Sequence, residues 1–440
     1  MDFFRNLVSR PRKLGLLALV ASTYAMVAGG PFGLEEIVGG NGYARAVLIL
    51  CLTPLLWAVP TAMMIGEMAG ALPENGGFYI WVRRAMGGFW GFQEAWLTLL
   101  GSIFDMAVYP ILFAACLGHL WPSLTHGKVP LVLGAAMIAA CVGMNLLGTR
   151  TVGESSIGFV LLLLAPFAVL AWLGFHTAGS AAQVAAPTLG KSDMFGGILI
   201  AMWNYMGWDN ASLIAGEVEN ARQGYQRAML VSVAVVTATY LIPVAAMAHA
   251  GVPQGAWETG SWVNIAETLG GRALGVAITA AGVVAAFSTF NALVLSLSRL
   301  PWAMARDGLL PRMFARENRC GAPWVAIVAC SILWGCAMSL GFDRTVTLDV
   351  VLTGLSILLE FAALVALRLR EPELERPYRV PGGAAGLALV CVPPALLLGV
   401  SAVRSRHEQI GPVNALAVAA GLIALGWVLY AVDVRRKRAA

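Results

Sequence analysis

Five carboxylates stand within apolar stretches of this sequence, where a charge is costly. Glu35 and Glu36 follow an apolar run that glycine and proline interrupt, in MVAGGPFGLEEIVGG. Asp209 belongs to a second such run, MWNYMGWDNAS, and Asp105 and Glu360 lie in the middle of two others. An ionised carboxylate at the centre of a membrane helix costs at least about 2.5 kcal/mol. Such acids therefore indicate cation or proton binding, unless polar neighbours satisfy them.

The elements that must position these acids are membrane helices. The chain has 440 residues, of which 59% are hydrophobic and 12% charged. Its apolar segments are about as long as the roughly 20 residues that a helix needs to cross a bilayer. The short alternating segments of an outer-membrane barrel are absent from the sequence. We predict an all-α integral membrane protein with twelve transmembrane helices, at 14–40, 45–69, 89–117, 129–147, 152–176, 193–216, 227–250, 264–303, 324–341, 346–369, 385–403 and 412–432.

The basic residues predict the orientation. With the N-terminus inside, 22 of the 29 lysines and arginines fall in cytoplasmic segments, as the positive-inside rule requires. We therefore expect a multi-pass protein of the cell (inner) membrane with both termini cytoplasmic. A cleaved signal peptide in KLGLLALVASTYA would break this agreement. The net charge of +5 is explained by these segments and needs no nucleic-acid partner.

Two predicted helices are interrupted at corresponding places. Span 1 is broken around Gly29, Gly30, Pro31 and Gly33, and span 6 around Gly207. Span 6 lies five spans after span 1, so the two cross in opposite directions, which indicates an inverted repeat with a substrate site between its halves. A kink that serves only packing is the alternative. We predict one transporter domain, 1–440, with repeats at about 14–176 and 193–369 and two extra helices at about 385–432.

Four motifs in order resemble the amino acid–polyamine–organocation transporter superfamily. They are LPENGGFYIWVRRAMGGFWGFQEAW, AGEVEN, SRLPWAMARDGLLPRMFA and LRLREPELERPYRVPGG. GGPFGLEE, WNYMGWD, LLEF and CVPP are similar to its polyamine-uptake branch. The resemblance implies a LeuT-like 5+5 fold with broken helices 1 and 6, alternating access, and coupling to protons or exchange. Span 5 lacks the lysine that many members carry, which puts a lysine-based coupling scheme in doubt.

The acids beside the break predict a cationic substrate. Glu35 and Glu36 point about 100° apart on a helix, so we expect one of them, preferably Glu35, to face a cavity. Asp105 and Tyr109 share a helix face. Aromatic rings near the breaks could stack on an ammonium group or only pack. The predicted substrate-binding residues are Gly29, Gly30, Phe32, Gly33, Glu35, Glu36, Asp105, Tyr109, Trp203, Asn204, Tyr205, Trp208 and Asp209.

These observations predict a secondary active transporter of small organic cations, such as a polyamine, a diamine or a basic amino acid. We expect proton-coupled symport, with Glu36, Glu360, Ser288 and Thr289 as candidates for the proton or ion. An importer or exchanger of neutral amino acids is the alternative. The five histidines form no metal-binding pair and the seven cysteines are scattered, so we predict no enzyme activity, metal or cofactor. The oligomeric state stays open.

Overall fold

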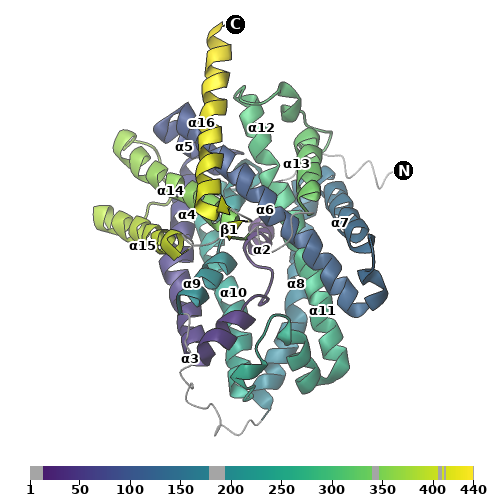
Figure 1. Cartoon of the computed structure of the whole chain (residues 1–440). Helices are drawn as coiled ribbons and strands as arrows, with labels where there is room; N and C mark the ends of the chain where they lie inside the picture. Colours follow the sequence, from purple (N-terminus) through teal and green to yellow (C-terminus); the bar gives the residue numbers. More distant parts are fainter. Residues whose placement is uncertain (1–12, 178–193, 339–345, 405–408, 411–412, 440) are drawn as a thin grey trace.

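The computed structural model describes residues 13–177, 194–338, 346–404, 409–410 and 413–439 (Figure 1). Within these ranges the chain is almost entirely helical. Two short strands, β1 (Gln409–Ile410) and β2 (Val413–Asn414), pair antiparallel. Arg5, Arg10 and Arg12, which support the predicted orientation, and most of the predicted outer segment 177–192 lie outside the described residues.

The helices follow one another along the whole chain. In order they are α2 (Leu16–Val27), α3 (Glu35–Thr53), η1 (Pro54–Ala58), α4 (Val59–Ala71), α5 (Gly77–Met86), α6 (Gly88–Leu120), η2 (Pro122–Thr125), α7 (Val129–Leu146), α8 (Thr149–His176), α9 (Met194–Asn204), η4 (Asp209–Glu217), α10 (Ala221–His249), η5 (Gln254–Ala256), α11 (Ser261–Leu297), α12 (Arg299–Arg306), η6 (Arg312–Ala315), α13 (Trp324–Ala337), α14 (Val346–Arg370), α15 (Gly383–Arg404) and α16 (Ala415–Ala439).

Eight helical stretches among the described residues are long and apolar enough to cross a membrane. They are Glu35–Ala71, Gly88–Leu120, Val129–Leu146, Thr149–His176, Ala221–His249, Ser261–Arg306, Val351–Arg370 and Gly383–Val403. Shorter apolar helices cover Leu16–Val27, Trp324–Ala337 and Leu416–Val432. The predicted all-helical membrane character is confirmed. The number twelve stays a prediction, because spans 1 and 6 are interrupted and span 9 extends beyond the described residues.

Two glycines change the predicted helix limits. Spans 1 and 2 meet at Gly42 inside α3, where the backbone turns with φ 74° and ψ 164°. Span 8 was predicted from residue 264, but Gly271, with φ 77° and ψ 176°, divides α11 and makes its first turns a separate segment. Glycine alone adopts this backbone region readily, so each helix changes direction there.

Both predicted interruptions are confirmed. α2 ends at Val27 and α3 begins at Glu35, and α9 ends at Asn204 before the 3₁₀ turns of η4 begin at Asp209. Gly207 between them has φ 92°. Lipid offers no partner to the backbone groups that such breaks release, so they must meet polar groups of the protein or a cavity.

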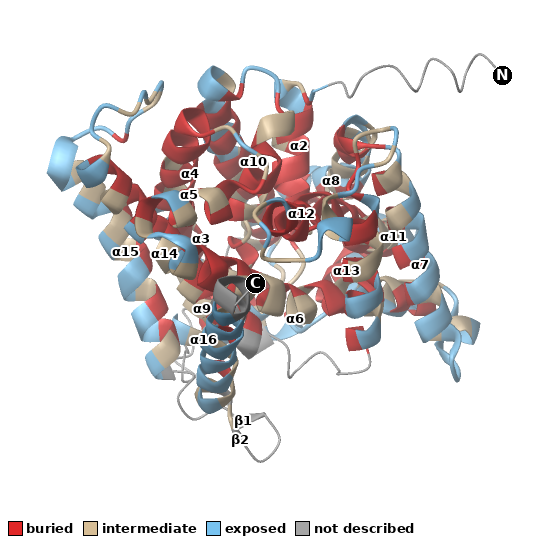
Figure 2. Cartoon of the chain, turned by 90° about the horizontal axis from the view of Figure 1, so that it is seen from above, coloured by how far each residue is buried: buried red, intermediate tan, exposed pale blue. Residues whose placement is uncertain are grey.

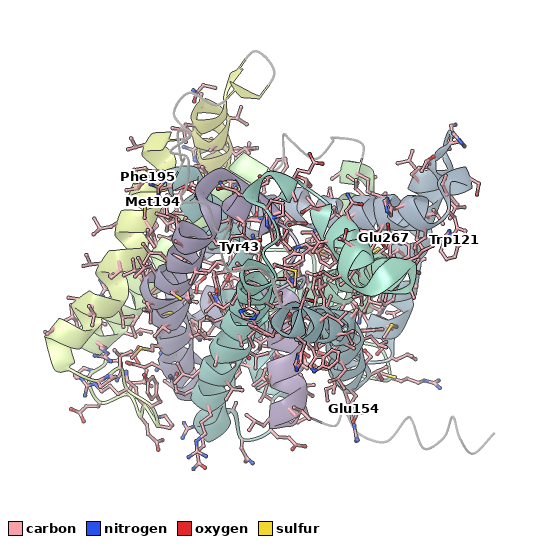
Figure 3. All side chains as sticks on the ribbon, turned by 90° about the horizontal axis from the view of Figure 1, so that it is seen from below. Tyr43, Trp121, Glu154, Met194, Phe195 and Glu267 are labelled. Atoms are coloured by element: carbon pink, nitrogen blue, oxygen red, sulfur yellow. The ribbon has the colours of Figure 1, made fainter. Side chains whose placement is uncertain are left out.

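The outer surface of the bundle is apolar. Figure 2 shows buried residues concentrated in α2, α10 and α12, while α7, α15 and α16 are largely exposed. Trp121 lies at the opposite edge of the molecule from Met194 and Phe195 (Figure 3), and all three side chains are exposed. Apolar surface of this extent is typical of contact with lipid.

Candidate functional site

The Glu35 carboxylate binds a backbone N–H group within the break between α2 and α3. Gly30 and Gly33 turn the backbone with φ of 82° and 87°. Oε2 of Glu35 accepts a hydrogen bond from the N–H of Gly33 at 2.6 Å. Glu35 also stands at the start of α3, where the helix dipole favours negative charge. Glu35 is 3% exposed, whereas Glu36 is exposed and accepts a hydrogen bond from Thr259 at 2.9 Å.

Side chains satisfy the carbonyls that the second break releases. The indole N–H groups of Trp208 and Trp57 both donate to the carbonyl of Tyr205, at 2.7 and 3.0 Å. Tyr240 donates its hydroxyl to the carbonyl of Asn204 at 2.8 Å. Tyr205 and Trp208 were predicted to contact substrate. The structure buries both fully and uses the Trp208 indole to hold the break.

The two breaks lie against each other. A Cβ atom on Gly33 would stand 3.5 Å from the amide nitrogen of Asn204 and 3.7 Å from the ring of Trp203. A Cβ atom on Gly207 would stand 2.8 Å from the carbonyl oxygen of Met26, at the end of α2. Close backbone approach therefore requires glycine at 207. The predicted residues of spans 1 and 6 are thus brought together.

Aromatic rings cover the first break. The ring of Phe32 meets that of Phe167 edge-on, with centroids 5.2 Å apart, and Phe167 meets Trp262 in the same way at 5.5 Å. Trp262 donates its indole N–H to the carbonyl of Pro31 at 2.9 Å. Trp262 belongs to the segment of α11 before the turn at Gly271, so this segment is fastened onto the break.

α6 and α14 contribute acids to the interior. Tyr109 donates to Asp105 at 2.9 Å, which confirms their predicted shared face, and both side chains are partly exposed. On α14, Thr353 donates to Asp349 at 3.0 Å. A Cβ atom on Gly101, one turn before Asp105, would lie 3.4 Å from Oδ1 of Asp349. Asp349 was not predicted as a site residue, although its carboxylate lies against α6 one turn before Asp105.

Three further acids are buried on α6, α14 and η4. Glu94 accepts hydrogen bonds from Thr98 at 3.1 Å and Ser356 at 2.7 Å. Glu360 is 0% exposed, and within the described chain neither of its carboxylate oxygens has a hydrogen-bond partner. Asp209 is 2% exposed, and its Oδ1 likewise has no partner among the described residues.

We call Glu94, Asp105, Asp209, Asp349 and Glu360 the acid cluster. The charge of Asp209 acts on each of the other four. No ion pair found among the described residues includes any member of the cluster. Carboxylates taken out of water without a counter-charge take up a proton or hold a cation. Glu94 was not among the predicted site residues. The 11-residue spacing of Glu94 and Asp105, which Asp349 and Glu360 repeat, was the available signal.

The predicted ion candidates of span 8 lie beside the first break. The Thr289 hydroxyl would stand 4.0 Å from a Cβ atom on Gly29. Ser288 is 2% exposed, and its hydroxyl has no hydrogen-bond partner in the part of the chain that the structure describes. Their ion-binding role stays a prediction. No group of histidine, cysteine and acidic side chains that could hold a metal ion occurs among the described residues.

One end of the bundle, here called the basic end, is held by buried ion pairs. Glu67 at the end of α4 accepts a hydrogen bond from Nε of Arg368 at 2.8 Å, and Arg376 approaches it at 3.3 Å. The N–H of Val380 donates to the same carboxylate at 2.7 Å. Glu67 is fully buried, so the segment after α14 is fastened across the end of α4.

A second network at the basic end joins the two halves of the chain. Nε of Arg299 donates to Glu217 at 3.0 Å, and its NH2 group donates to Thr149 at 2.9 Å. At the surface nearby, Arg84 forms an ion pair with Glu371 at 2.7 Å, and this guanidinium lowers the pKa of the Glu371 carboxyl. These contacts link α5, α8, η4, α12 and the segment after α14.

The chain belongs to the amino acid permease family. A family model with that description matches residues 19–425, which is most of the chain. The family defines a membrane transporter, and this membership supports a non-enzymatic role.

Named transporters resemble the chain over nearly its full length. A probable polyamine transporter of Arabidopsis thaliana is 34% identical over 96% of this chain and 88% of its own. The polyamine transporter PUT1 of Oryza sativa subsp. japonica is 33% identical over 94% of this chain and 78% of its own. The serine/threonine exchanger SteT of Bacillus subtilis is 24% identical over 84% of this chain and 86% of its own.

Proposed function

We propose that this chain is a secondary active transporter of polyamines or closely related organic cations. The observation that carries the proposal is the acid cluster, which lies beside the second break and has no ion-pair partner among the described residues. Ammonium groups supply the charge and the N–H donors that these carboxylates lack. The names of two of these relatives, both polyamine transporters, agree with this substrate class.

The proposed architecture is a LeuT-like 5+5 repeat of helices within a single domain of twelve helices. The site between the broken helices opens alternately to the two sides of the membrane. The basic end is the cytoplasmic end, both termini lie on that side, and the protein resides in the cell (inner) membrane. The Trp262 contact closes the site outward, and the Arg299 and Glu67 networks close it inward.

Proton coupling is part of the proposal. A diamine neutralises two carboxylates, and the acid cluster contains five, so the remaining acids must bind protons when the cluster is occupied. When a short diamine is bound and does not neutralise it, Glu360 is the first candidate, because it is fully buried and has no partner among the described residues. Glu36, Ser288 and Thr289 are the other candidates from the sequence.

Uptake into vesicles tests this function. We expect radiolabelled spermidine to accumulate in proteoliposomes when the outside is more acidic than the inside, and a protonophore to abolish the accumulation. Uptake driven only by amine loaded inside the vesicles would contradict proton coupling and indicate exchange. Saturating serine or alanine should leave spermidine uptake unchanged. Strong competition by them would favour a carrier of neutral amino acids, as in the relative SteT.

A further inference from the structure

The acids of α6 and α14 repeat with the same spacing. Glu94 and Asp105 are 11 residues apart on α6, and Asp349 and Glu360 are 11 residues apart on α14. Eleven residues make three helical turns plus about 20°, so the two acids of each helix point in nearly the same direction. They are separated by roughly 16 Å along the helix axis. Each helix therefore presents two carboxylates, three turns apart, on one face.

The two helices match these positions across their contact. Asp349 lies against α6 one turn from Asp105, as the distance of 3.4 Å to a Cβ on Gly101 shows. At the other level, the hydroxyl of Ser356, one turn before Glu360, donates to Glu94 at 2.7 Å. The acids thus form a distal pair, Asp105 with Asp349, and a basic-end pair, Glu94 with Glu360.

Asp209, at the start of η4, interacts electrostatically with both pairs. The charge of Asp349 acts with those of Asp105 and Asp209, and the charge of Glu360 acts with those of Glu94 and Asp209. Asp209 is the one acid that interacts with both levels. The cluster therefore offers three acidic levels, here called the ladder: two pairs three turns apart along the α6–α14 contact, and Asp209 at the break before η4, whose charge acts on both pairs.

The basic-end pair lacks hydrogen-bond donors for most of its carboxylate oxygens in the described part of the chain. Both carboxylate oxygens of Glu360 and Oε2 of Glu94 have no hydrogen-bond partner among the described residues, and both side chains are 0% exposed. Of the two Glu94 oxygens, only Oε1 accepts from the Thr98 and Ser356 hydroxyls, which also lie 2.9 Å from each other. A buried carboxylate without a donor is unfavourable. An arriving ammonium group would supply up to three donors at this level.

A linear polyamine has the length of this ladder. With bonds of about 1.5 Å, two nitrogens joined by four methylenes lie roughly 6 Å apart in an extended chain, and the ends of a tetra-amine such as spermine lie roughly 15 Å apart. A diamine reaches two neighbouring levels, whereas a longer amine reaches all three.

Building on the proposed function, we propose that Glu94 and Glu360 form a subsite for the leading ammonium of tri- and tetra-amines and so determine selectivity for chain length. Short diamines bind between Asp209 and the distal pair, where Asp105 and Tyr109 are partly exposed. The basic-end pair then favours spermidine and spermine over putrescine, because a diamine held between Asp209 and the distal pair does not extend to it.

Uptake kinetics of Glu360→Gln test the subsite. KM is measured for putrescine, spermidine and spermine in proteoliposomes containing the wild-type protein, Glu360→Gln, and the matched control Glu373→Gln. Glu373 is an exposed acid in the segment after α14, and it forms no ion pair with any described residue. We expect Glu360→Gln to raise the ratio of the spermidine KM to the putrescine KM at least about tenfold. A change of this size corresponds to the loss of one hydrogen bond to a charged group. Glu373→Gln should leave the ratio unchanged.

Each outcome decides the proposal. An equal change of KM for all three amines in Glu360→Gln overturns the subsite, because it indicates a general or proton-coupling role. If Glu360→Gln does not accumulate in the membrane, Glu94→Gln is measured in the same way, and an unchanged ratio in that variant overturns the subsite. A wild-type protein that transports none of the amines contradicts the proposed function itself.

Discussion

Replacing Asp209 with asparagine is expected to reduce spermidine uptake at least about tenfold at substrate concentrations below KM. Asp209 is 2% exposed, begins η4 immediately after the second break, and interacts with every other acid of the cluster. Hydrogen bonds to a charged group contribute about 1.5–3 kcal/mol, and each 1.4 kcal/mol is about tenfold in affinity. Asparagine keeps the shape of the side chain but removes the charge that holds an ammonium group.

Initial rates in proteoliposomes, normalised to the amount of reconstituted protein, measure this effect. The midpoint of thermal unfolding should not fall, because the substitution removes a buried charge that has no ion-pair partner among the described residues. Glu373→Gln serves as the control and should transport at the wild-type rate. Wild-type uptake by Asp209→Asn would show that the cluster does not bind the substrate.

Replacing Glu67 with glutamine is expected to lower the free energy of unfolding by about 3–5 kcal/mol, because it breaks a buried ion-pair network from one side. Glu67 is fully buried and is the partner of Arg368 and Arg376, whose side chains are 6% and 4% exposed. Glutamine leaves both guanidinium groups without their counter-charge. The loss is measured as a decreased midpoint of thermal unfolding of the purified protein in detergent.

Glu371→Gln is the matched control for Glu67→Gln. It breaks the ion pair with Arg84, which lies at the same end of the bundle but has side chains 42% and 32% exposed. Exposed ion pairs contribute about 0–1 kcal/mol, so we expect little change in stability. Equal unfolding midpoints for the two variants would contradict a structural role of the buried network.

Local chemistry made part of the site predictable. Gly30, Gly33 and Gly207 adopt backbone angles that other residues avoid, so these glycines made both breaks predictable from the sequence. The contact between Asp105 and Tyr109 follows from a spacing of four residues on one helix. Burial of Glu35 and exposure of Glu36 follow from the angle between neighbouring helical positions.

The rest of the site depends on contacts between distant parts of the chain. Glu67 meets Arg368 across 301 residues, and Ser356 meets Glu94 across 262. Helical periodicity predicts on which face of its helix an acid lies, but not which other helix packs against that face. For that reason Asp349 and Glu94 were missed as site residues. The turns at Gly42 and Gly271 were also missed, since an isolated glycine in an apolar run is common in membrane helices.

The central claim is that buried acids beside the broken helices bind an organic cation. The most direct test is ligand binding by the purified wild-type protein, measured as the shift of its unfolding midpoint with putrescine, spermidine, spermine, arginine, serine and alanine. We predict that the polyamines raise the midpoint in a saturable manner and that serine and alanine do not. Stabilisation by serine or alanine with no response to any polyamine would contradict the claim.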